Sequence, residues 1–175
     1  MENTGMQKMN RRYVLYSLAA AAAGLAGFGV ARWHRLEERR SMWGLNFEMP
    51  QGGSLAMAQF LGKPLLLNFW ATWCPPCVEE LPLLDDFYLK NKAQDWQVVG
   101  LAVDQTSAVQ RYLRQAPLSF PVAVVGAGGI ELSRAWGNLS GALPFSLVFG
   151  AEGKLLHQHL GKVSQDDLSA WARLR

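Results

Sequence analysis

The sequence is poor in residues that bind metals or form cross-links. Its 175 residues include only two cysteines and three histidines. The cysteines stand three positions apart, which excludes a framework of several disulfides. A zinc site would need His34, His157 or His159 in addition to both cysteines. The sequence therefore predicts no resident metal and no cofactor other than the sulfur pair itself.

A strong excess of one charge is also missing. The net charge is +3, and 18% of the residues are charged. Residues 32–175 hold 14 Lys and Arg against 13 Asp and Glu, so the surplus lies largely in the first 31 residues. No basic patch indicates a nucleic-acid partner. Half of the residues are hydrophobic and there is no internal repeat, which is typical of one globular domain with an appendage.

Residues 13–31 form a long uncharged stretch near the start of the chain. It is rich in Ala and Gly and is just long enough to cross a bilayer as a helix. Gly29-Val-Ala31 resembles a small-x-small cleavage site, and Arg11-Arg12 partly resembles a twin-arginine export signal. Residues 1–31 are therefore predicted to be an uncleaved membrane anchor or a cleaved signal sequence, with a soluble helix as a third alternative. Residues 32–44 are predicted to be a linker.

Residues 45–175 are predicted to form one domain. Apolar runs and alternation predict strands, and helical spacing and capping residues predict helices. Strands are expected at 45–49, 55–57, 65–70, 98–103, 145–149 and 155–160, and helices at 76–91, 106–115, 130–136 and 164–174, with a short apolar stretch at 120–125. Thr106 is expected to cap its helix, and Ser164 with Asp167 reads as a capping box. This order predicts an α/β fold with a mixed central sheet flanked by helices and an N-terminal β extension.

Both cysteines lie in the motif Cys74-Pro75-Pro76-Cys77, between a buried strand and a helix. A helix N-terminus stabilises a thiolate, and the thiolate is the form that attacks disulfides. We therefore expect Cys74 to be the nucleophile and Cys77, within the first helical turn, to be the more buried resolving thiol. The motif predicts dithiol–disulfide chemistry.

Four segments carry a family resemblance: the Gly-Gly-Ser-Leu segment at 52–55, 62–82 with the Trp-Cys-Pro-Pro-Cys motif, 99–104, and 143–149. Over roughly residues 45–170 the chain resembles the TlpA/ResA branch of thioredoxin-fold thiol–disulfide oxidoreductases. The resemblance implies a thioredoxin-like fold with a single N-terminal hydrophobic helix. It also implies a protein that is anchored in or exported across the inner membrane, on its periplasmic side.

The resemblance further implies which residues surround the dithiol. Pro144 is expected to be a cis-proline facing the cysteines, as a catalytic-site residue. The substrate-binding surface is expected to comprise Trp73, Pro75, Pro76 and Leu143.

Glu80 is the fourth expected catalytic residue. Thioredoxin carries a buried acid in the strand before its motif, where this chain has Asn68. In the TlpA/ResA branch a glutamate three residues after the second cysteine takes that place, and here it is Glu80. A carboxylate one turn from Cys77 would accept its proton. The alternative is that Glu79 and Glu80 only complement the positive end of the helix.

The expected partners are proteins that bear disulfides and an upstream membrane thiol that supplies electrons. Family analogy favours reduction, for example of apocytochrome c or metallochaperone cysteines, but the motif itself leaves the direction open. Two alternatives remain. A thiol peroxidase of peroxiredoxin type, with antioxidant activity, would use Thr72 and Cys74, although their spacing is one residue short. A copper chaperone would use the cysteines with His157 and His159, which share a strand face.

Overall fold

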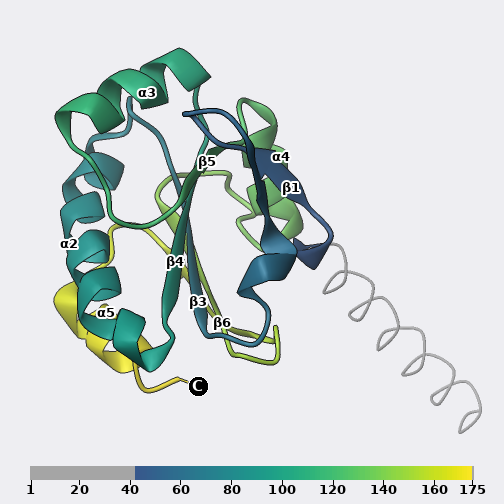
Figure 1. Cartoon of the computed structure of the whole chain (residues 1–175), viewed down its shortest axis with the longest axis vertical. Coiled ribbons are helices and arrows are strands. Elements are labelled where there is room, and N and C mark those ends of the chain that lie inside the picture. The colour runs from purple at the N-terminus through teal and green to yellow at the C-terminus, as the bar shows by residue number, and fades with distance from the viewer. Residues whose placement is uncertain (1–41, 175) are drawn as a thin grey trace, which may run out of the picture. The chain divides into compact units, whose positions relative to one another are not determined.

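The computed structural model describes residues 42–174 (Figure 1). The predicted anchor or signal within 1–31 and most of the predicted linker lie outside the described residues. Across residues 42–174, no helix has the length and hydrophobicity needed to cross a membrane.

Seven strands form one sheet in the order β2-β1-β5-β4-β3-β6-β7. The strands are β1 (Asn46–Glu48), β2 (Ser54–Ala56), β3 (Leu65–Trp70), β4 (Gln97–Ala102), β5 (Val122–Val124), β6 (Phe145–Phe149) and β7 (Leu155–Leu160). The three central strands β3, β4 and β5 are parallel, whereas β1, β2, β6 and β7 add antiparallel pairs at the two sides. The predicted mixed sheet and its N-terminal β extension are confirmed.

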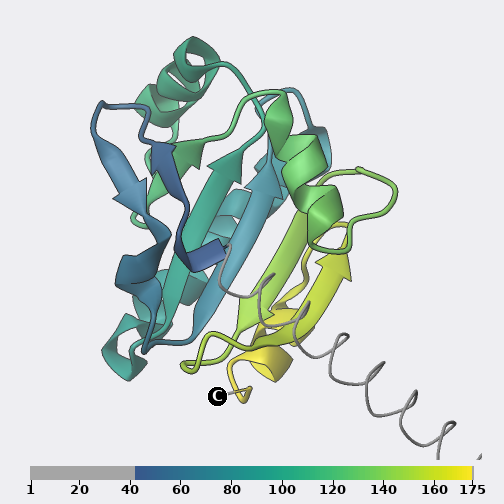
Figure 2. The same ribbon diagram turned by 90° about the vertical axis from the view of Figure 1, so that its right-hand side faces the viewer.

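Helices cover both faces of this sheet (Figures 1 and 2). One face carries α2 (Pro75–Asn91), α3 (Thr106–Gln115) and α5 (Gln165–Trp171), and the other carries α4 (Gly128–Ala135) and the 3-10 helix η1 (Met57–Phe60). A second 3-10 helix, η2 (Lys92–Gln94), follows α2 directly. All six residues of β3 are buried because helices pack on both of its faces, as the sequence predicts from its run of apolar residues, which only Asn68 interrupts.

Three details at helix ends differ from or refine the sequence predictions. The prediction that Thr106 caps α3 is wrong: Gln105 occupies the N-cap position and makes no side-chain capping bond. The Ser164–Asp167 capping box is confirmed, but α5 ends at Trp171 rather than near Leu174. Helix α2 begins at Pro75, since a proline ring has the backbone angle of a first helical turn.

Candidate active site

The two cysteines form a disulfide at the start of α2, immediately beyond β3. Cys74 is the N-cap residue and Cys77 lies in the first turn, with 5.3 Å between their Cα atoms. Cys77 is completely buried and Cys74 retains slight exposure, which is the order expected for a resolving and an attacking sulfur. Pro75 and Pro76 have no N–H, so the backbone donors of this turn begin at Cys77.

Glu80 follows one turn later and is also completely buried. Both of its carboxylate oxygens accept hydrogen bonds. Asn68 Nδ2 donates to Oε1 over 2.8 Å, and the Val163 backbone N–H donates to Oε2 over 2.7 Å. The carboxyl group therefore lies under the helix, between β3 and the segment that joins β7 to α5, on the same helix side as Cys77.

Asn68 is placed by strand register. It is paired with Ser146 across the antiparallel β3–β6 ladder, and its Nδ2 also donates to Ser146 Oγ over 3.0 Å. Asn68 Oδ1 is buried and has no hydrogen-bond partner among the described residues. The residue that replaces the acid of thioredoxin is therefore a hydrogen-bond donor to Glu80.

The environment of Glu80 favours its protonated form. Burial raises the pKa of Glu80 to about 7, and the hydrogen bonds from Val163 and Asn68 and the charge of Lys162 only partly oppose that rise. A group with this pKa exchanges its proton near neutral pH. The alternative for the pair is that both acids only complement the positive helix end; in the structure Glu80 is buried under the helix, with hydrogen bonds from Asn68 and Val163. Glu79 is the solvent-exposed acid of the pair, and its Oε2 lies 2.6 Å from Lys162 Nζ.

The expected substrate-binding residues lie mostly at the surface around Cys74. Trp73 is 63% exposed, and Pro75 and Pro76 are exposed as well. The Leu143–Pro144 peptide bond is cis, as expected. Leu143 is half-buried, whereas Pro144 is buried and its carbonyl accepts the Gly161 N–H over 2.9 Å.

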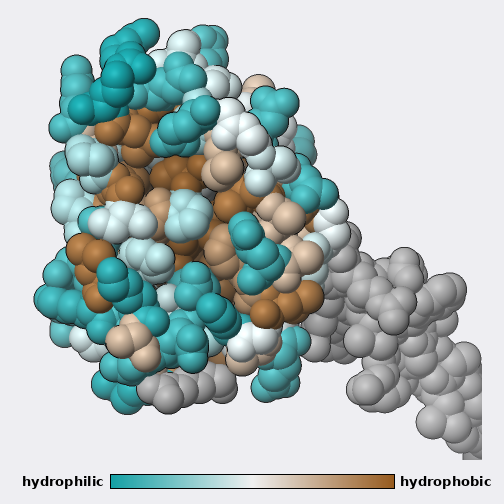
Figure 3. All heavy atoms as spheres, viewed as in Figure 1, coloured by the Kyte–Doolittle hydropathy of each residue, from teal (hydrophilic) through white to brown (hydrophobic). Residues whose placement is uncertain are grey.

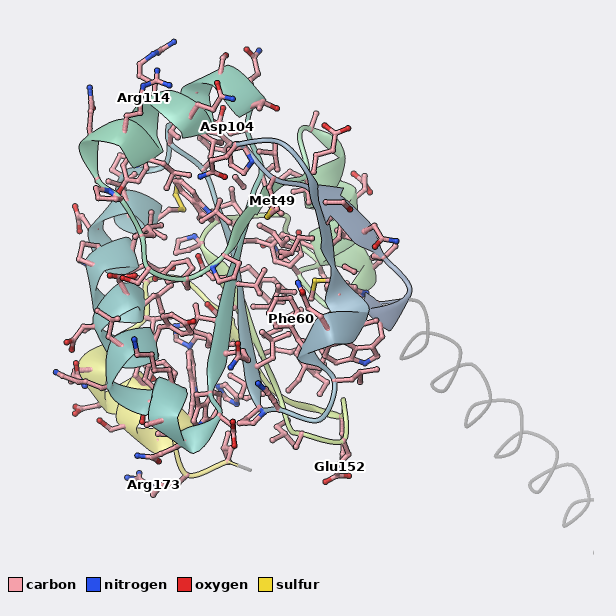
Figure 4. All side chains as sticks on the ribbon, in the orientation of Figure 1. Met49, Phe60, Asp104, Arg114, Glu152 and Arg173 are labelled. Carbon is pink, nitrogen blue, oxygen red and sulfur yellow. A yellow bond between two sulfur atoms is a disulfide. The ribbon has the colours of Figure 1, made fainter. Side chains whose placement is uncertain are left out.

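Asp104 holds the segment that leads into the motif. Its Oδ2 accepts hydrogen bonds from the Thr72 N–H, over 2.9 Å, and from Thr72 Oγ1, over 2.6 Å. Figure 4 shows Asp104 at the end of β4, close to the start of α3. Thr72 is thus engaged in a loop anchor, which differs from the role that a peroxidase would give it.

The two strand histidines are placed against α5. The rings of His157 and His159 lie 5.4 and 5.5 Å from that of Trp171. Within residues 42–174, no group of three or more His, Cys, Asp or Glu side chains is arranged to hold a metal ion. The strand histidines therefore contribute to packing on α5.

A shallow groove lies elsewhere on the surface, between α3, β5 and the turn after β1. It is lined by Met49, Gln51, Leu113, Pro117, Leu118 and Phe120, among others. Figure 3 shows apolar residues exposed in the middle of this side, within a largely hydrophilic rim. None of the cysteines, Glu80 or Pro144 lines the groove.

Comparison with known proteins agrees with this geometry. The family model described as Redoxin matches residues 46–173. The chain belongs to the Redoxin family.

Several relatives carry the name thiol-disulfide oxidoreductase ResA. The Redoxin-family chain is 32% identical over 124 residues to the protein of Bacillus anthracis, covering 70% of this chain and 69% of the relative. It is 28% identical over 172 residues to that of Bacillus thuringiensis subsp. konkukian, covering 95% and 97%. Among solved structures, a thiol:disulfide interchange protein from Chlorobium tepidum superposes with a TM-score of 0.65 at 27% identity, covering 74% of this chain and 91% of that one. This Redoxin-family protein therefore has a thioredoxin-like fold and is a thiol–disulfide oxidoreductase.

The sequence pointed to the cysteines, Glu80 and Asn68, but not to the hydrogen bonds that Asn68 and Val163 donate to Glu80. Ser146 and Asn68 become neighbours through the β3–β6 register. A predicted antiparallel pairing of 65–70 with 145–149 would have placed Asn68 opposite Ser146. The Val163 N–H gives no sequence signal, because any residue except proline supplies the same donor.

Proposed function

We propose that this protein reduces disulfides of other proteins through a Cys74/Cys77 dithiol cycle in which Glu80 accepts and returns a proton. The observation that carries the proposal is a buried carboxyl group, with a pKa of about 7, one helical turn after the resolving cysteine. A base at that position favours the step that releases a reduced substrate.

The cycle begins with the reduced protein. The Cys74 thiolate attacks one sulfur of the substrate disulfide, which forms a mixed disulfide and expels the other sulfur as a thiolate that takes up a proton. Cys77 then gives its proton to the Glu80 carboxylate and attacks Cys74 Sγ. The Cys74–Cys77 bond forms, the bond to the substrate breaks, and the second substrate sulfur leaves as a thiolate. Two electrons have passed from the dithiol to the substrate.

Glu80 is free to return its proton to the solvent or to the leaving sulfur. A dithiol of an upstream membrane donor then attacks the Cys74–Cys77 bond, and its second thiol resolves the resulting mixed disulfide, so that the donor is oxidised to a disulfide and the Cys74/Cys77 dithiol is restored. The exposed side chains of Trp73, Pro75 and Pro76, with Leu143 beside the cis-proline, supply the apolar surface on which a substrate polypeptide would lie.

The proposed location is the periplasmic side of the inner membrane. Stable disulfide chemistry belongs outside the cytosol, and the uncharged residues 13–31 suit either an anchor or an export signal. Reduction of cysteine pairs in exported proteins, such as apocytochrome c or metallochaperones, fits that location. Protease accessibility of the full-length chain in spheroplasts, with N-terminal sequencing of the mature protein, tests location and cleavage together.

Trapping experiments test the exchange cycle. Full-length Cys77→Ser protein is expected to accumulate mixed disulfides with its substrates, because the resolving step is blocked. The matched Cys74→Ala variant lacks the attacking sulfur and is expected to form no adducts through the motif. Mass spectrometry of the adducts identifies the partners, and absence of adducts with Cys77→Ser would contradict the mechanism.

The reduction potential of the Cys74–Cys77 pair tests the direction. Potentials of related sites span from about −270 to about −120 mV, so the measured value places the protein among reductants or oxidants. A value near the oxidising end would overturn the reductase proposal and leave thiol–disulfide exchange itself intact.

A further inference from the structure

The segment between β7 and α5 contacts α2 through two neighbouring residues on each side. Lys162 Nζ lies 2.6 Å from Glu79 Oε2, and the Val163 N–H donates to Glu80 Oε2 over 2.7 Å. Residues 79 and 162 are exposed, and residues 80 and 163 are buried. One exposed ion pair therefore stands directly outside the buried hydrogen bond to the proposed proton acceptor.

The backbone on both sides of Lys162 is held by other contacts. The Gly161 N–H donates to the Pro144 carbonyl over 2.9 Å, and the Ser164 N–H donates to Asp167 Oδ2 over 2.9 Å. Neither of these contacts reaches α2. In the described part of the chain, the polar contacts from residues 161–164 to α2 are made by Lys162 and Val163, so the ion pair is well placed to control how closely the segment approaches the helix.

We propose that Lys162 is a positioning residue for the redox reaction. Through its ion pair with Glu79 it holds the Val163 N–H against the Glu80 carboxylate. This contact keeps Glu80 able to accept a proton from the resolving thiol. The inference rests on the proposed function, because it assigns a device that supports the role of Glu80.

Among the residues that the structure describes, the charged or titratable groups around Glu80 include Lys162 from the β7–α5 segment, Glu79 on the same helix and, in the reduced protein, the Cys77 thiol. β3 presents the neutral amide of Asn68, and β7 presents His159, whose ring Nε2 lies 3.4 Å from the Lys162 carbonyl oxygen. The positive charge of Lys162 and the Val163 hydrogen bond both lower the pKa of Glu80, against the larger effect of burial. Loss of Lys162 removes the charge and loosens the hydrogen bond, so less Glu80 is ionised at neutral pH.

The test measures release of a chromophoric aromatic thiol from a preformed mixed disulfide with Cys74. Release depends on attack by Cys77, so its pH profile reports the resolving step. In the full-length protein, Lys162→Met is expected to move the midpoint of this profile upward and to slow release at pH 7 about twofold, as a modest rise in the Glu80 pKa requires. Lys162→Glu, which repels Glu79, is expected to move the midpoint further.

Lys90→Met is the matched control. It removes a comparable exposed ion pair, because Lys90 Nζ lies 2.6 Å from Asp86 Oδ2 on the same helix. Its release profile is expected to match that of the unmodified protein. The double exchange Glu79→Lys with Lys162→Glu restores an ion pair of reversed polarity, and is expected to return the midpoint towards its original value.

Three results would overturn the proposal. The first is an unchanged midpoint of the release profile in Lys162→Met, and the second is an equal change of the midpoint in Lys90→Met. The third is a double exchange whose midpoint does not return towards the original value, because the charge of Lys162 alone, and not its ion pair with Glu79, would then be the cause. Glu80→Gln separates this proposal from the proposed function. If Glu80→Gln keeps the original pH profile, Glu80 is not the proton acceptor and the proposed function fails. If Glu80→Gln loses the profile, and adding Lys162→Met to that variant changes nothing further, Lys162 acts through Glu80.

Discussion

The two faces of β3 are equally buried but differ in chemistry. Towards α4 the strand presents Leu65, Leu67 and Phe69, which pack in an apolar cluster. Towards α2, Asn68 interrupts the apolar series and binds Glu80. Burying a carboxyl group destabilises its charged form. The core face beneath the redox helix therefore carries a hydrogen-bonded polar pair beside the proposed proton acceptor, while the side chains of β3 on the opposite face are all apolar.

The largest effect is expected from a cavity on the apolar face. Leu67→Ala removes a completely buried side chain from β3 and is expected to lower the free energy of unfolding by about 4 kcal/mol. Urea denaturation of the oxidised protein measures it. The pH profile of thiol release should stay unchanged, and a shifted profile would contradict the separation of the two faces.

The second effect is the pH dependence that Glu80 gives to stability. Its pKa is raised in the folded protein from 4.5 to about 7, so between these values the folded state holds a proton that the unfolded state has lost. Stability from this group is therefore fully present below pH 4.5 and is lost as the pH rises through 7.

Glu80→Gln removes this titration while keeping the shape of the side chain. Relative to the variant, the unmodified oxidised protein is expected to lose about 3 kcal/mol of unfolding free energy between pH 4 and pH 8. Urea denaturation at several pH values measures the difference. Glu79→Gln, on the exposed neighbour, is the control. A pH-independent difference for Glu80→Gln would show that the Glu80 pKa is not raised.

A smaller effect is expected from the amide on the polar face. In the unmodified protein, the hydrogen bond from Asn68 to Glu80 Oε1 lowers the pKa of Glu80, and Asn68→Leu removes this bond. The pKa of Glu80 should therefore rise further, by about one unit for the loss of a bond to a charged group. Carbon-detected NMR titration of the Glu80 carboxyl group measures it directly. A fall in this pKa would contradict the assigned direction of the hydrogen bond.

The smallest effect is expected at Ser146. Ser146→Ala removes one of two acceptors of the Asn68 amide, and the bond to Glu80 remains. The free energy of unfolding should fall by about 1 kcal/mol, the typical net value of one hydrogen bond. Thermal unfolding measures it, with the Glu80 titration as a companion. A change in the Glu80 pKa as large as that of Asn68→Leu would show that Ser146 controls the amide.

Much of the fold could be predicted from local patterns. The run Leu65–Trp70 followed by a motif with two prolines indicated a buried strand entering a helix, and the structure has β3 and α2 there. Helix ends were less predictable. Thr106 has a side chain suited to capping, but α3 begins one residue earlier than that role requires, so that Gln105 takes the N-cap position. End positions depend on where tertiary packing stops, which local residue types do not encode.

The redox pair can be predicted without the structure, because two cysteines at this spacing and at a helix start are a local arrangement in the sequence. The sequence also placed Glu80 one turn beyond Cys77, through helical periodicity. The burial of Glu80 and the exposure of Glu79 depend on tertiary packing, as do the hydrogen bonds from Asn68 and Val163 to Glu80. The ion pair between Lys162 and Glu79 depends on it as well. Those contacts join residues up to 83 positions apart. The pKa of a carboxyl group depends on burial and on neighbouring donors, so it emerges only when distant segments of the chain come together.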